Sequence, residues 1–89
     1  MLKDQVTIIN KLGLHARAAA LFASTAGRYA SHIRVGVNGK LVDAKSVMSL
    51  MLLAANKGSE LNIEVEGQDQ EEAMAAICDL INDRFGEDE

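Results

Sequence analysis

Two segments of this chain alternate β-branched or leucine side chains with polar or small ones, and this period of two restricts the fold more than any other feature. The alternating segments are 33–37 and 61–65. Because successive side chains of a strand point to opposite faces, each segment predicts a strand that is buried on one face only. The chain is therefore expected to build a sheet with one covered face and one face in water.

Two further strands are predicted beside these segments. Residues 5–9 are rich in β-branched side chains, and residues 40–43 follow the pair Asn38-Gly39. Asparagine and glycine tolerate the positive φ angles of a tight hairpin turn, so 33–37 and 40–43 are expected to pair as antiparallel strands.

Three helices are predicted between and after the strands. Residues 16–26 form the first helix, which Gly27 ends, and its buried face is expected to consist of Ala19, Phe22, Ala23 and Ala26. Ser46 precedes a second helix over 47–56, which Gly58 ends. Asp69 and Glu72 resemble a capping box that opens a third helix. The apolar stripe of this third helix is Ala73, Met74, Ile77, Leu80 and Ile81.

These elements follow one another in the order β-α-β-β-α-β-α. The simplest fold that buries their apolar faces is an α+β open-faced sandwich, in which a four-stranded, mostly antiparallel sheet carries three helices on one face. The 89 residues suffice for a single domain spanning 1–89, but not for a second core or a deep cleft. Only Gly86–Glu89 is expected to be a loose tail.

The distribution of charge narrows the functional classes. Eight of the 9 Lys and Arg residues lie in 1–58, whereas eleven of the 13 Asp and Glu residues lie in 59–89, and the net charge is −4. A basic half suits an acidic protein or a phosphate group. Nucleic acid normally calls for a net positive domain with aromatic platforms, and aromatic residues make up only 3% of this chain, so no nucleic-acid partner is expected.

The length of the apolar stretches and the number of cysteines bear on the location of the protein and on its cofactors. The longest nearly apolar stretch, 47–55, is too short to span a bilayer, and the chain begins with a strand pattern instead of a signal peptide, so a cytoplasmic protein without a membrane partner is expected. Cys78 is the only cysteine and has no neighbouring metal ligand, so no metal and no cofactor are expected. Cys78 is interpreted as a packed helix residue, and His32 as a surface residue.

His15 is the main candidate for chemistry because it directly precedes the first helix. The backbone N–H groups of Ala16, Arg17 and Ala18 lack partners within the helix and are suited to bind an anion. The helix dipole favours the neutral, nucleophilic form of the imidazole near pH 7, and the same N–H groups and the Arg17 guanidinium can hold the oxygens of a phosphoryl group on the ring. From spacing alone, a histidine that only caps the helix or rests on the surface remains an alternative.

The segment 47–55 is informative because only Ser49 in it is polar. A helix that is apolar on every side cannot be buried completely in so small a domain. Leu50, Leu53 and Ala54 are expected to face the core. A partner-docking surface near His15 is expected to consist of Val47, Met48 and Met51 from this segment and Ala20, Leu21 and Ser24 from the first helix. A helix sandwiched deeply inside the protein is the alternative.

The string Gly13-Leu14-His15-Ala16-Arg17 resembles the phosphorylation-site motif of HPr, the histidine-containing phosphocarrier of the phosphoenolpyruvate-dependent phosphotransferase system. The resemblance covers nearly the whole chain. It includes Asn38-Gly39-Lys40, the segment Ala44-Lys45-Ser46-Val47-Met48, and the end of the last strand at Glu66-Gly67.

The resemblance implies a carrier that is not itself an enzyme. It implies that His15 accepts a phosphoryl group on Nδ1 from phosphorylated enzyme I and passes it to a downstream EIIA-type acceptor, and that Arg17 stabilises the phosphate. Ser46 corresponds to the family's regulatory serine, which the ATP-dependent HPr kinase/phosphorylase modifies. The protein is expected to act as a monomer.

One residue departs from the family motif. Proline commonly follows the arginine, and this chain has Ala18 instead. This leaves open a second interpretation, a regulatory protein-binding module of a nitrogen-related phosphorelay with little role in sugar transport. A small hydrolytic enzyme is the weakest interpretation, because no second base, nucleophile or metal cluster accompanies His15 in the sequence.

Overall fold

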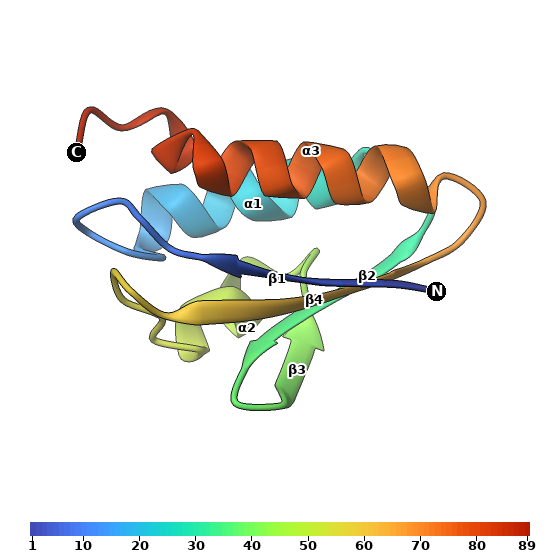
Figure 1. Ribbon diagram of the computed structural model, residues 1–89, viewed down its shortest axis with the longest axis horizontal. Helices are drawn as coiled ribbons and strands as arrows, with labels where there is room; N and C mark the ends of the chain where they lie inside the picture. The colour runs from blue at the N-terminus through green and yellow to red at the C-terminus, as the bar shows by residue number, and fades with distance from the viewer.

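A four-stranded antiparallel sheet organises the protein. The computed structural model describes residues 1–89 and places the strands in the order β1 (Leu2–Thr7), β4 (Glu60–Glu66), β2 (His32–Val37) and β3 (Lys40–Asp43). Each neighbouring pair is antiparallel (Figure 1). Asn38 and Gly39 have φ angles of 55° and 81°, which confirms the predicted tight turn between β2 and β3.

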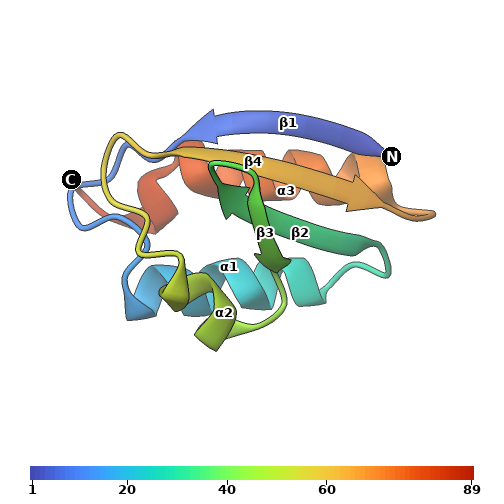
Figure 2. The ribbon, with the colours of Figure 1, turned by 90° about the horizontal axis from the view of Figure 1, so that it is seen from below.

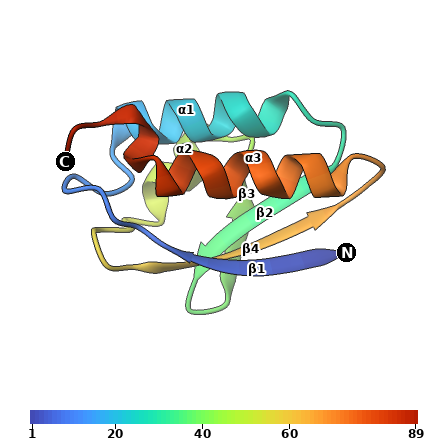
Figure 3. The same cartoon turned by 45° about the horizontal axis from the view of Figure 1, so that its top comes forward.

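The helices cover one face of this sheet. The two long helices, α1 (Ala16–Gly27) and α3 (Gln70–Asn82), lie side by side over the strands (Figures 1 and 3). The short helix α2 (Val47–Leu52) packs against α1 and β3. Seen from below, the strands lie in front of α3, with no helix over them (Figure 2). The predicted open-faced sandwich is therefore confirmed.

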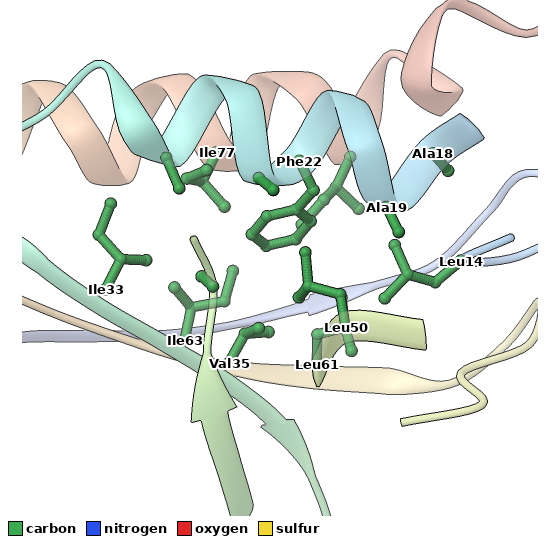
Figure 4. Close-up of a cluster of buried hydrophobic side chains, with 14 of the residues drawn as sticks. Leu14, Ala18, Ala19, Phe22, Ile33, Val35, Leu50, Leu61, Ile63 and Ile77 are labelled. Atoms are coloured by element: carbon green, nitrogen blue, oxygen red, sulfur yellow. The ribbon is translucent and has the colours of Figure 1, made fainter. Parts of the chain in front are cut away.

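The core lies between the sheet and the helices. It contains 20 buried side chains, including Phe22 of α1, Leu50 of α2 and Ile63 of β4, which point toward one another (Figure 4). The four residues predicted for the buried face of α1 are all buried, and Ala18 joins them. Burying a large apolar side chain contributes about 1.5–3 kcal/mol, so this shared cluster fixes the position of α1 on the sheet.

Two predicted boundaries are wrong. The first strand runs from Leu2 to Thr7 and not from residue 5 to 9. The second helix ends at Leu52 and not at Asn56, because Ala54 adopts a left-handed φ of 51° and turns the chain before Gly58 is reached. Ala54 is consequently exposed, contrary to the prediction, and Ala55 is buried.

The predicted capping box at the start of α3 is also wrong. The Asp69 side chain makes no capping hydrogen bond to α3. Its carboxylate instead accepts hydrogen bonds from the backbone N–H groups of Ala30 (2.8 Å) and Ser31 (2.9 Å) and from the Ser31 hydroxyl. Asp69 therefore joins the start of α3 to the loop between α1 and β2.

The end of the chain is not the loose tail that the sequence predicts. A short turn, η1 (Arg84–Gly86), follows α3 with φ angles of 56°, 53° and 76°, and its Phe85 side chain is buried in the core. The backbone N–H of Lys11 then donates to the Glu89 carbonyl at 3.0 Å, and Arg84 Nη1 donates to the Asp88 carbonyl at 3.3 Å. The C-terminal residues thus lie against the loop that precedes α1 (Figure 1).

The Asp69 carboxylate should make the stability of the protein fall at low pH. Hydrogen bonds from Ser31 and Ala30 hold the pKa of this carboxyl below its ordinary value of 3.8. Its stabilising contribution is therefore complete above that value and is lost as the pH falls through the lower pKa of the folded protein. We expect Asp69→Asn to lower the urea midpoint at pH 7 and to flatten the loss of stability in acid.

Urea denaturation at several pH values tests this expectation. Asp79→Asn is the matched control, since it removes one carboxylate from the exposed side of α3. An Asp69→Asn midpoint equal to that of the wild type at pH 7 would contradict the prediction.

Candidate functional site

His15 is the N-cap residue of α1 and lies at one end of the helical layer. Its backbone is extended (φ −78°, ψ −179°), and the first backbone hydrogen bond of the helix runs from Ala19 N to His15 O at 2.8 Å. The N–H groups of Ala16, Arg17 and Ala18 have no acceptor within the protein. The imidazole makes no capping hydrogen bond, so the alternative of a histidine that only caps the helix is wrong.

The loop before His15 is held against the segment that follows α2. Gly13 adopts a φ of 66°, and a Cβ atom at this position would lie 2.6 Å from the Ala55 carbonyl oxygen. Leu14 N donates to the same carbonyl at 2.9 Å, and the Leu14 side chain is buried. Only glycine allows this approach, and the result is a fixed position for the residue that follows Leu14.

Glu87 is the site residue that the sequence analysis missed. Its Oε2 atom is hydrogen-bonded to His15 Nε2, and only 11% of the Glu87 side chain and 29% of the His15 side chain are exposed. His15 Nδ1 makes no hydrogen bond within the protein. The sequence predicts a loose tail over 86–89, which is wrong for Glu87. No local pattern marks this residue, since 72 positions separate it from His15.

The charge of Glu87 is stabilised by its neighbours. Burial raises the pKa of this carboxyl, but hydrogen bonds from His15 and Asn10 and electrostatic attraction to His15 and Arg17 outweigh that effect and hold the pKa below its ordinary value of 4.5. Glu87 is therefore ionised at neutral pH. An ionised carboxylate only accepts hydrogen bonds, so His15 Nε2 must carry the proton.

Asn10 connects the loop to Glu87. It is fully buried, and its Nδ2 atom donates to the Gly13 carbonyl at 2.8 Å and to Glu87 Oε1 at 3.0 Å. Because both neighbours are acceptors, the amide must present its NH₂ group to them. Asn10 thus fixes one carboxylate oxygen while His15 engages the other.

The hollow beside His15 is shallow and carries charges of both signs, since Lys11 and Arg17 line it together with Glu87, Asp88 and Glu89. Arg17 is exposed on the first turn of α1, and it lines this hollow together with His15 and the C-terminal tail. Lys11 also lines this hollow, and its ammonium lies 3.5 Å from the Glu89 carboxylate. Free N–H groups and a guanidinium on one side of the imidazole suit the oxygens of an anion such as a phosphoryl group.

The side chains predicted for the docking surface lie outside the core. Met48 is 74% exposed and Met51 is 44% exposed, so the alternative of a deeply sandwiched second helix is wrong. Val47, Ala20, Leu21 and Ser24 are exposed as well. Leu52, for which the sequence analysis makes no prediction, is 81% exposed.

Ser46 is the N-cap residue of α2. Its Oγ atom accepts a hydrogen bond from Ser49 N at 3.2 Å, as the sequence predicts. The neighbouring Lys45 ammonium donates to the Tyr29 carbonyl at 2.8 Å, which joins this helix start to the end of α1.

The other residues examined in the sequence lie apart from this site. His32 is exposed on β2. Cys78 is partly buried on α3, and burial together with the nearby Asp4 carboxylate raises the pKa of its thiol. No group of three or more His, Cys, Asp or Glu side chains is arranged to hold a metal ion. None of the helices has the length and apolar character needed to cross a bilayer.

Known proteins resemble this chain in sequence and in structure. The family described as the PTS HPr component phosphorylation site matches residues 2–83. The phosphocarrier protein HPr of Pseudomonas aeruginosa is 55% identical over 86 residues, which are 96% of each chain. This match takes in the motif around His15 and nearly all of the fold.

Solved structures agree with these matches. HPr-C-His from Thermoanaerobacter tengcongensis superimposes with a TM-score of 0.95 at 45% identity and covers 100% of both chains. An HPr dimer from the same organism has a TM-score of 0.78 at 46% identity and covers 98% of this chain and all of its own. The chain belongs to the HPr family of phosphocarrier proteins of the phosphotransferase system.

Proposed function

We propose that this protein accepts a phosphoryl group on His15 Nδ1 from phosphorylated enzyme I and passes it to a downstream EIIA-type protein. The observation that carries the proposal is the placement of His15 at the first turn of α1, with Nε2 bound to Glu87 and Nδ1 without a hydrogen bond. In the neutral imidazole whose proton lies on Nε2, the Nδ1 lone pair is available to form a bond to phosphorus.

The first turn of α1 stabilises the transferred group. The free N–H groups of Ala16, Arg17 and Ala18 supply donors, and the Arg17 guanidinium supplies a full positive charge. The positive end of the helix dipole adds to their effect. Donors that are already in place need no reorganisation when the phosphoryl group arrives, which favours rapid and reversible transfer.

The protein functions in this proposal as a carrier and not as a catalyst, since the group that it receives is handed on. The relatives with 50–55% identity bear the phosphocarrier name and do not favour the alternative of a regulatory module in a nitrogen-related phosphorelay. The nucleophile on which a carrier depends is retained at His15.

The exposed side chains of α1 and α2 supply the surface on which the partners dock. Methionine side chains are flexible and adapt to surfaces of different shape, which suits a carrier that binds a donor and then an acceptor. Leu21 of α1 and Val47 of α2 are also exposed, and the two helices pack against each other.

Ser46 has a regulatory role in this proposal. A phosphate on Ser46 would lie at the start of α2, where the helix dipole accommodates negative charge, so the fold should survive modification by an HPr kinase. The added charge would lie beside Val47 and Met48, at the edge of the docking surface. It would therefore weaken partner binding without unfolding the protein.

His15→Ala should fold normally and accept no phosphoryl group. The variant is incubated with phosphoenolpyruvate and enzyme I and weighed intact by mass spectrometry. The wild type should gain the mass of one phosphoryl group, and the control His32→Ala should gain it equally, because His32 is an exposed residue of β2. Full labelling of His15→Ala would remove His15 from the proposal.

Arg17→Ala should slow transfer without unfolding the domain, since Arg17 is exposed. Losing one charge-assisted contact costs about 1.5–3 kcal/mol, which corresponds to a decrease of roughly one to two orders of magnitude in rate. Rapid-quench measurement of transfer from phosphorylated enzyme I gives the rate. A rate equal to that of the wild type would show that the guanidinium does not contact the transferring group.

Met48→Glu and Ser46→Asp should both weaken binding to enzyme I, by roughly tenfold or more for an anchor residue, because each places a negative charge at the docking surface. The melting temperature should change little, because Met48 is 74% exposed and aspartate also caps a helix. Titration calorimetry measures the affinity. Ala75→Glu, on the exposed side of α3, adds the same charge as a control. A large loss of stability with unchanged affinity would place these side chains outside the docking surface.

A further inference from the structure

The contact between His15 and Glu87 joins the two ends of the fold. Glu87 belongs to the segment after α3, whereas His15 precedes α1, and 72 positions separate them. Both side chains are largely shielded from water, since 29% of His15 and 11% of Glu87 are exposed. A charged hydrogen bond in such surroundings is stronger than one on an open surface.

The Glu87 carboxylate is held from several directions. Its Oε1 atom accepts from the buried Asn10 amide at 3.0 Å, which leaves Oε2 directed at the ring. The turn that precedes Glu87 is anchored by the buried Phe85 side chain, and the backbone beyond it is held by the hydrogen bond from Lys11 N to the Glu89 carbonyl. Anchors on both sides give Glu87 a defined position.

A fixed carboxylate at Nε2 determines the chemistry of the other ring nitrogen. A neutral imidazole carries one proton, which can reside on either nitrogen. An acceptor-only group at Nε2 requires the proton there and leaves the Nδ1 lone pair free. Removing the carboxylate would allow the opposite tautomer, whose protonated Nδ1 cannot attack phosphorus.

We propose that Glu87 is a positioning residue that holds the proton of neutral His15 on Nε2, orients the ring, and thereby makes Nδ1 the nucleophile for phosphoryl transfer. This inference rests on the proposed function, since it assigns the means by which that site is prepared for reaction.

The transfer balances without any movement of the Nε2 proton. The Nδ1 lone pair forms the new bond to phosphorus, while the bond between phosphorus and the donor breaks and its electron pair stays with the donor. The ring gains one positive charge because its proton stays on Nε2. The Glu87 carboxylate faces this charge and stabilises it, and on transfer to the acceptor the same steps run in reverse.

Glu87→Gln tests the proposal, because it preserves the shape of the side chain and removes the charge. A glutamine amide can accept from a protonated Nε2 or donate to an unprotonated one, so it no longer enforces one tautomer. The ¹⁵N chemical shifts of the His15 ring, measured above the pH at which the imidazole titrates, report the tautomer directly. We expect the Nε2-protonated form to predominate in the wild type and the Nδ1-protonated form to increase in Glu87→Gln.

The rate of phosphorylation by enzyme I provides the second measurement. We expect Glu87→Gln to react about tenfold more slowly, since the variant keeps a neutral hydrogen bond but loses the compensating charge. Glu72→Gln is the matched control, because it makes the same change at an exposed position of α3, outside the hollow beside His15. Its tautomer and its rate should equal those of the wild type.

Two results would overturn the proposal. A Glu87→Gln protein with the tautomer and rate of the wild type would show that the contact is only structural, and faster transfer in that variant would show that the tail obstructs His15. The tautomer measurement needs no phosphoryl donor, so it distinguishes a failure of this inference from a wild type that accepts no phosphate.

Discussion

The burial of one face of α1 against the sheet is the constraint on which the site depends. Ala18, Ala19 and Phe22 are completely buried, so α1 cannot rotate or slide without opening the core. The first turn of this helix contains both the buried methyl group of Ala18 and the exposed Arg17 guanidinium. The packing that stabilises the fold therefore also fixes the free N–H groups and the position of His15.

Much of the fold could be predicted from the sequence because its signals are local. The alternation in β2 and β4 and the stripe along α1 each lie within one segment, and the Asn38-Gly39 turn needs only two residues. The end of α2 could not be found in this way. Ala54 takes a left-handed conformation that alanine rarely adopts. Tertiary packing outweighs the local preference for helix here, since Ala55 is buried and its carbonyl accepts a hydrogen bond from Leu14 N.

The candidate site shows the same difference between residues with a local sequence signal and residues placed by tertiary contacts. His15 and Arg17 could be identified because they belong to one short motif at a helix start. Glu87 could not, because its contact with His15 depends on the left-handed turn at 84–86, which no local pattern predicts, and on the buried Asn10 amide, which lies 77 positions away. Asp69 was misassigned for a related reason. Its carboxylate binds the loop before β2 and not the helix that its position suggests.

Ala18 illustrates how the fold and the site share one residue. The family motif commonly has proline here, and proline would supply a fixed φ angle but no N–H donor. Alanine leaves its N–H without an acceptor in the protein while its methyl group fills a completely buried position. Three consecutive donors, and not two, are then available at the start of α1. The flexibility that proline would have removed is restricted by other means, because Leu14 is bonded to Ala55 and Ala18 is packed in the core, so the helix start keeps its rigidity and gains a donor.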